Sequence, residues 1–169
     1  MKFLMTTATL AAAILVTTGI AQAANETNEL SSNGVSHCQG ALPNFEGAFR
    51  KRPLAIDNEG SAPAFLTCAF ELRSTGALGH AVDVWFGNNT ATGKTINCTG
   101  VQGFNGTSEA VTRSVVVPGN SQDNVTWTDA DFAAGIGGLL SISCQLPPGT
   151  GINDTYAAWL ENDATEPPP

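Results

Sequence analysis

The sequence predicts an all-β fold, an antiparallel β-sandwich of about eight short strands, immunoglobulin-like or jelly-roll-like, with two disulfides. Three observations lead to this prediction. Apolar and polar residues alternate over short segments, clusters of Gly, Asn and Pro separate these segments, and the chain contains four cysteines. A small barrel is the alternative architecture.

The first half of the chain contains four predicted strands. Residues 54–58 follow Pro53, which interrupts any helix, and end at a turn that contains Gly60. In residues 64–73, four apolar side chains share one face: Leu66, Cys68, Phe70 and Leu72. Residues 80–86 alternate in the same way, so Trp85 falls on the face opposite Val82 and Val84. Residues 95–99 form the fourth.

The second half contains four more predicted strands. They span 111–117, 124–128, 140–146 and 154–160. Turn residues at 118–120 and 147–149 separate them, and Leu140, Ile142 and Cys144 share one face. Trp159 alternates with its neighbours in a way that leaves its exposure undecided. No long segment repeats apolar residues at helical spacing.

The N-terminal residues 1–23 have the pattern of a signal peptide. Lys2 precedes an apolar stretch at 10–16, and Ala21-Gln22-Ala23 has the small residues that signal peptidase recognises. The apolar stretch is too short and interrupted for a membrane span, so we expect no membrane anchor after cleavage. We expect a flexible leader at 24–34, one sandwich domain at 35–161, and a disordered tail at 162–169 that ends in three prolines.

The cysteines Cys38, Cys68, Cys98 and Cys144 are expected to form two disulfides, because an exported chain matures in an oxidising compartment. They lack the close pairs typical of a zinc site. Three pairings are possible. We expect Cys68–Cys98, which joins strands close in the chain, and Cys38–Cys144, which anchors the N-terminal arm.

The charge of the chain excludes several functions. With 15 acidic and 7 basic residues, its formal net charge is −8 at pH 7. Such a protein repels nucleic acid and anionic membrane surfaces. The basic cluster Arg50-Lys51-Arg52 is interpreted as an exposed turn, with a processing site or a contact for an acidic partner as alternatives.

Catalytic residues are sparse in this sequence. His37 and His80 are the only histidines, and no nucleophile motif accompanies them. Three acidic residues are candidates for a carboxylate-dependent hydrolase: Glu71, Asp83 and Glu109. Because alternation places Glu71 and Asp83 on the solvent side of their strands, we expect no enzyme, and we also expect no cofactor.

A calcium site is a weaker hypothesis. Asp129, Asp131 and Asp154 supply oxygen ligands in predicted loops, but the EF-hand pattern is absent. Asp129 could instead cap a short turn. We therefore predict no metal site and keep these three residues as calcium candidates.

A ligand site is predicted around Trp85. Alternation exposes this residue next to Asn88 and Asn89, and an exposed indole beside amide groups is suited to carbohydrate or protein contact. If both faces of the sheet were covered, Trp85 would belong to the core instead.

Several segments carry a resemblance to a known group of sequences. They are 50–56, 58–60, 65–68, 96–100 and 144–156, which resemble uncharacterised exported proteins of proteobacteria. The resemblance implies bacterial export and structural cysteines, but no activity. We therefore predict a secreted or periplasmic, disulfide-stabilised binding module with a protein or carbohydrate ligand. The alternatives are a small extracellular hydrolase and a subunit of a surface assembly.

Overall fold

The computed structural model describes residues 25–72, 78–103 and 107–162. The predicted signal peptide and residues 163–169 of the predicted tail lie outside the described residues. In the described part of the chain, no helix has the length and apolar character that a bilayer crossing requires.

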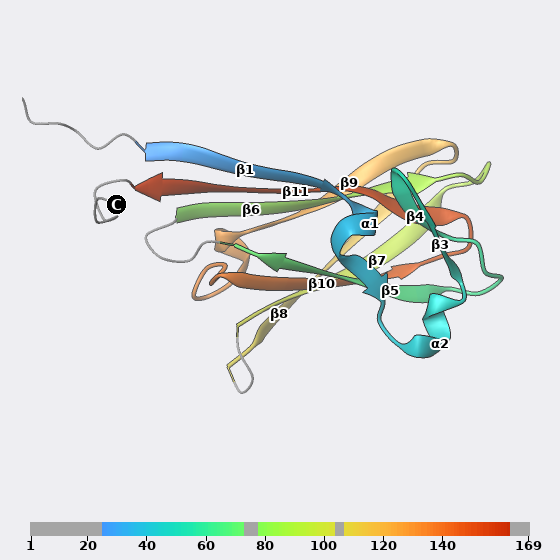
Figure 1. Ribbon diagram of the computed structural model, residues 1–169, viewed down its shortest axis with the longest axis horizontal. Coiled ribbons are helices and arrows are strands. Elements are labelled where there is room, and N and C mark those ends of the chain that lie inside the picture. Colours follow the sequence, from blue (N-terminus) through green and yellow to red (C-terminus); the bar gives the residue numbers. More distant parts are fainter. Residues whose placement is uncertain (1–24, 73–77, 104–106, 163–169) are drawn as a thin grey trace, which may run out of the picture.

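The described residues form two antiparallel sheets that pack face to face (Figure 1). The first sheet has the order β3 (Phe49–Arg52), β4 (Ala55–Asn58), β11 (Thr150–Asn162), β6 (Leu78–Asn88) and β9 (Ser121–Thr128), and β1 (Asn25–Asn33) also pairs with β11. The second sheet has the order β2 (Cys38–Gly40), β5 (Ala64–Glu71), β10 (Leu139–Leu146), β7 (Lys94–Gln102) and β8 (Glu109–Val117). Two short helices, α1 (Gly34–His37) and α2 (Pro43–Glu46), connect the early strands.

The strand order is that of a jelly roll. The four-stranded layer β4-β11-β6-β9 faces the layer β5-β10-β7-β8. The connections between strands of the two layers have the Greek-key order that defines a jelly roll. The β-sandwich prediction is confirmed, and the structure selects the jelly-roll alternative. All eight predicted strands are present as β4 to β11, with ends that differ by up to four residues.

The core lies between the inward faces of the two sheets. Leu66 of β5, Phe86 of β6 and Trp127 of β9 are fully buried there, as the alternation requires. The indole Nε1–H of Trp127 donates to the carbonyl of Val111, 3.1 Å away, so the buried ring leaves no polar atom unpaired. Gly100 lies directly against this ring, because a Cβ there would come within 2.6 Å of Trp127 Nε1.

The predicted disulfide pairing is wrong. Cys38 bonds to Cys68, and Cys98 bonds to Cys144. Each bond joins residues directly opposite each other on neighbouring strands of the second sheet, β2–β5 and β7–β10. A Cys68–Cys98 bond is impossible here, because β10 separates β5 from β7 and two strand spacings of about 4.8 Å exceed the reach of a disulfide.

The predicted flexible leader at 24–34 is also wrong over most of its length. Residues Asn25–Asn33 form β1, which pairs with β11 from Asn162 to Asp154 (Figure 1). Their composition disfavours a strand, but the exposed edge of β11 supplies the hydrogen-bond partners. The folded unit therefore includes Asn25–Asn33, which precede the predicted start at residue 35. The basic cluster also belongs to a strand, β3, rather than to a turn.

Candidate functional site

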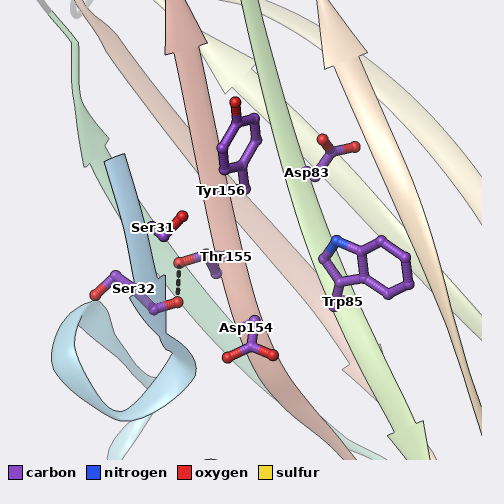
Figure 2. A pocket seen from close by; sticks show the side chains of 7 residues that line it. All are labelled: Ser31, Ser32, Asp83, Trp85, Asp154, Thr155 and Tyr156. Atoms are coloured by element: carbon purple, nitrogen blue, oxygen red, sulfur yellow. Dashed lines mark hydrogen bonds between the residues drawn. The ribbon is translucent and has the colours of Figure 1, made fainter. Parts of the chain in front are cut away.

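The outer face of the first sheet carries an open groove of about 440 Å³ (Figure 2). It follows β11, with β1 on one side and β6 on the other. Seven residues line it: Ser31, Ser32, Asp83, Trp85, Asp154, Thr155 and Tyr156. Three segments that are distant in the sequence thus meet at one surface feature.

Strand alternation sets which side chains reach this groove. In β6, Val84 and Phe86 are completely buried, so Asp83 and Trp85 point outward. In β11, Tyr156 lies directly opposite Asp83 in the register. Trp85 has an exposed fraction of 40%, which confirms the prediction that its ring reaches the surface.

A bulge in β11 adjusts the floor of the groove. Ile152 pairs with Phe86 and Thr155 pairs with Val84, so β11 contains one residue more than β6 over this stretch. Both Ile152 and Thr155 are buried despite their odd spacing. The extra residue turns the exposed Asp154 toward the groove, where Figure 2 shows it below Thr155.

Asp83 is held in place by the neighbouring strand β9. The Nδ2 of Asn124 donates to Asp83 Oδ1 over 3.0 Å, and the hydroxyl of Thr126 donates to the same oxygen. Both donors therefore use one carboxylate oxygen. Among the described residues, both side-chain donors to this carboxylate bond to Oδ1 rather than Oδ2.

Tyr156 keeps its proton over a wide pH range. A hydrogen bond to Glu29 of β1, partial burial, and the negative charges of Glu29 and Asp83 raise the pKa of its hydroxyl. The side chain therefore presents a neutral ring and a phenol to the groove. Glu29, which the sequence did not single out, belongs to the surroundings of the site.

A buried polar contact fixes β1 and α1 against β11. The hydroxyl of Thr155 donates to the carbonyl of Ser32 over 3.1 Å and lies 2.7 Å from Nε2 of His37. Burial lowers the pKa of His37. Its neutral ring also packs edge-on against Phe70, so His37 has a structural role beneath the groove wall.

Asn88 does not line the groove with Trp85, although the sequence grouped the two residues. Its side chain is buried, and its Nδ2 donates to the carbonyls of Thr92, Val117 and Pro118 at 2.8 to 3.1 Å. An amide placed beside a turn closes that turn by such bonds. Asn89 is exposed but lines a separate polar pocket of about 240 Å³, so the structure does not bring it into the groove with Trp85.

The calcium candidates do not form a common site. Asp129 accepts hydrogen bonds from the backbone N–H of His80 at 2.9 Å and of Ile136 at 2.8 Å. Asp131 accepts from the backbone N–H of Thr128 at 2.7 Å and from Arg113. Both thus stabilise the 3₁₀ turn η1 (Asp129–Asp131) and its surroundings. Asp154 lies in the groove instead, and the described residues contain no group of three His, Cys, Asp or Glu that could hold a metal ion.

The capping box of η1 is formed by Thr128 and Asp131 rather than by Asp129, but the hydrogen bonds to the Asp129 carboxylate make stability depend on pH. Burial acts to raise the pKa of Asp129, but the hydrogen bonds from Ile136 and His80 and the charge of His80 outweigh it and lower that pKa. A lowered folded-state pKa stabilises the protein above the unfolded-state pKa of about 3.9, and this stability is lost as the pH falls through the folded-state value. We expect Asp129→Asn to lower the free energy of unfolding by on the order of 1 kcal/mol at pH 7.

Urea unfolding at pH 7 and pH 3 measures this effect. The difference between Asp129→Asn and the unchanged protein is expected to shrink at pH 3, where the wild-type carboxylate starts to be protonated. Asp154→Asn is the matched control, since Asp154 is exposed and its side chain makes no hydrogen bond within the described residues. An equal loss in both variants, or a loss independent of pH, would contradict the stabilising role of the hydrogen bonds to Asp129.

The acidic residues proposed for hydrolysis are not paired. Asp83 faces outward from the first sheet, whereas Glu71 and Glu109 belong to strands of the second. Glu109 accepts a hydrogen bond from the backbone N–H of Ala133 over 2.8 Å. His80, one of the two histidines, is buried and its ring contacts Asp129. The arrangement that would protonate and attack a glycosidic bond with these three acids is therefore not formed.

Comparison with known proteins gives similarity of fold only. No protein-family model matches the sequence, and no curated protein matches it. A CBM35 module from Cellvibrio japonicus has 10% identity and a TM-score of 0.45, covering 77% of this chain and 92% of the module. A CBM22–GH10 xylanase structure from Clostridium thermocellum has 12% identity and a TM-score of 0.45, covering 85% of this chain. A GH26–CBM35 mannanase from Podospora anserina has 13% identity and a TM-score of 0.44, covering 83% of this chain. The chain spans 27% of the xylanase structure and 29% of the mannanase.

Proposed function

We propose that this protein is a binding module that holds an oligosaccharide in the groove along β11. The observation that carries the proposal is the exposed indole of Trp85, which shares a groove with Tyr156 and with carboxylate and hydroxyl groups. A large ring at the surface costs solvation free energy unless a ligand covers it. The groove volume is within the range of about 300 to 1,000 Å³ typical of small-molecule sites.

The composition of the groove suits a sugar ring. One face of many sugars consists of C–H groups, which pack on aromatic rings such as Trp85 and Tyr156. The sugar hydroxyls need partners around the ring edge, and Asp83 and Asp154 accept hydrogen bonds from them. Ser31 can donate or accept. A site with apolar rings and a few convergent polar groups is the usual form of a specific binding site.

We further propose that the protein acts outside the cytoplasm. All four cysteines of the chain form disulfides, and such bonds persist in oxidising compartments. The expected signal peptide and the resemblance to exported proteobacterial proteins support the same location. Carbohydrate-binding modules occur among the structures of similar fold, but the proposal rests on the groove.

The proposal is tested by titrating the protein lacking residues 1–23 with a panel of soluble oligosaccharides while tryptophan fluorescence and heat are recorded. We expect at least one oligosaccharide to bind and Trp85→Ala to weaken its binding by about tenfold or more. The matched control is Phe65→Ala, because Phe65 is 37% exposed but lies on the second sheet. Binding that survives Trp85→Ala unchanged, or a panel without any ligand, would refute the proposed function.

A further inference from the structure

The groove is negatively charged, and the binding of a neutral sugar does not require this charge. Two of its seven lining residues, Asp83 and Asp154, are acidic, and none is Lys or Arg. A third carboxylate, that of Glu29, is hydrogen-bonded to the hydroxyl of Tyr156 at the same surface. Figure 2 shows Asp83 and Asp154 on two adjacent strands, with the rings of Trp85 and Tyr156 in the same open space.

No basic side chain of the described residues neutralises these carboxylates. The described Lys and Arg residues lie elsewhere, on β3, β7 and β8: Arg50, Lys51, Arg52, Lys94 and Arg113. Three of them are engaged in ion pairs outside the groove, Arg50 with Glu59, Arg52 with Asp57 and Glu59, and Arg113 with Asp131. The negative charge of the groove is therefore available to a ligand.

The aromatic side chains favour the same kind of ligand. The faces of Trp and Tyr rings carry partial negative charge and attract cations, with Trp the strongest. In this groove the exposed face of Trp85 and the phenol of Tyr156 lie beside Asp83, which is directly opposite Tyr156 in the register. An ammonium group placed there can contact a ring and a carboxylate together. A ligand that carries carboxylates or phosphates would be repelled.

We propose that the groove recognises a cationic glycan, a polymer of amino sugars whose free amino groups are protonated. This inference rests on the proposed function, because it assigns the charge class of the oligosaccharide that the groove holds. A sugar ring packs on Trp85, and the ammonium groups of different sugar units donate hydrogen bonds to the carboxylates of Asp83 and Asp154. Charge-assisted hydrogen bonds of this kind are stronger than those made to neutral groups.

The test compares two ligands that share one backbone, a hexamer of glucosamine and a hexamer of N-acetylglucosamine. At a pH below the pKa of the sugar amines, the first is cationic and the second is neutral. We expect the glucosamine hexamer to bind about tenfold more tightly in low salt and to lose most of this advantage at high ionic strength. A hexamer of galacturonic acid is expected to bind more weakly than either.

Isosteric substitutions locate the charge. Asp154→Asn and Asp83→Asn should each weaken binding of the cationic hexamer several-fold more than binding of the neutral hexamer, because both hexamers lose a hydroxyl acceptor but only the cationic one loses a charge partner. The side chain of Asp154 makes no hydrogen bond within the described residues, so its variant is not expected to disturb the fold. Glu71→Gln is the control, because it removes the same charge from an exposed residue of the second sheet.

The outcomes separate this inference from the function it depends on. If both hexamers bind equally and both need Trp85, the groove binds glycans but the charge inference is wrong. If no oligosaccharide of any charge binds, the proposed function fails. If a hexapeptide of lysine binds as tightly as the glucosamine hexamer, the groove recognises cations in general and the assignment to a glycan is overturned.

Discussion

Replacement of Cys98 and Cys144 by alanine is expected to lower the free energy of unfolding by about 4 kcal/mol. The bond closes a loop with a sequence separation of 46 residues, and reopening it restores conformational freedom to the unfolded chain. The two strands that it joins, β7 and β10, lie in the interior of the second sheet. Since domains of this size are stabilised by about 5 to 15 kcal/mol, the loss is a large share of the total.

Chemical denaturation of the variant measures this change, and the other disulfide provides the comparison. Cys38–Cys68 has a separation of 30 residues, so the loop-closure model also gives it about 4 kcal/mol. However, it attaches the three-residue edge strand β2, whose loss can remain local. We expect hydrogen exchange in the Cys38→Ala, Cys68→Ala variant to rise mainly near β2 and α1. A loss below about 1 kcal/mol from Cys98→Ala, Cys144→Ala would contradict the model.

The disulfide variants also test whether stability and ligand binding are independent. All four cysteines belong to the second sheet, whereas the groove is formed by strands of the first. A disulfide variant that remains folded should therefore bind the same oligosaccharide with unchanged affinity.

The strands themselves could be predicted from the sequence because alternation is a local property. A segment such as 80–86 shows which side chains face inward, and this information correctly placed Val84 in the core and Trp85 at the surface. The pairing of strands is not local. Cys68 and Cys98 both point inward as predicted, but β10, from far along the chain, lies between their strands. The disulfide pairing was wrong for that reason.

The candidate site was only partly predictable for the same reason. Trp85 was identified, but Tyr156 joins it through the pairing of β6 with β11, which are separated by four other strands in the chain. Asn88 lies outside the groove, because a turn amide has the same sequence signature whether it closes its own turn or contacts a ligand, and here it closes the turn. Ser31 gave no signal, since its strand has few β-forming residues and depends on the edge of β11.

Deletion of residues 25–33 is expected to weaken oligosaccharide binding by about tenfold or more while the sandwich stays folded. β1 supplies one wall of the groove through Ser31 and Ser32, and Glu29 of the same strand holds the hydroxyl of Tyr156. Without β1, Tyr156 loses this partner and the groove becomes open on one side.

The fold is expected to survive because no described side chain of β1 belongs to the main core. None of the buried residues of the hydrophobic cluster comes from β1, and β11 still pairs with β6 and β4 after the deletion. Thr155 loses the Ser32 carbonyl but keeps its contact with His37. Circular dichroism and calorimetric titration of the deletion variant test both parts of the prediction.

A second variant distinguishes the contribution of the two serine hydroxyls from that of the whole strand β1. Ser31→Ala, Ser32→Ala keeps the backbone of β1, which pairs with β11 through main-chain hydrogen bonds, and removes only two hydroxyl groups. It should weaken binding less than the deletion does. The deletion also exposes the edge of β11 over residues 154–162, so it should self-associate at high concentration, whereas the serine variant should not. If the deletion variant bound as tightly as the full chain, β1 would not form part of the site, and the ligand would have to contact β6 and β11 alone.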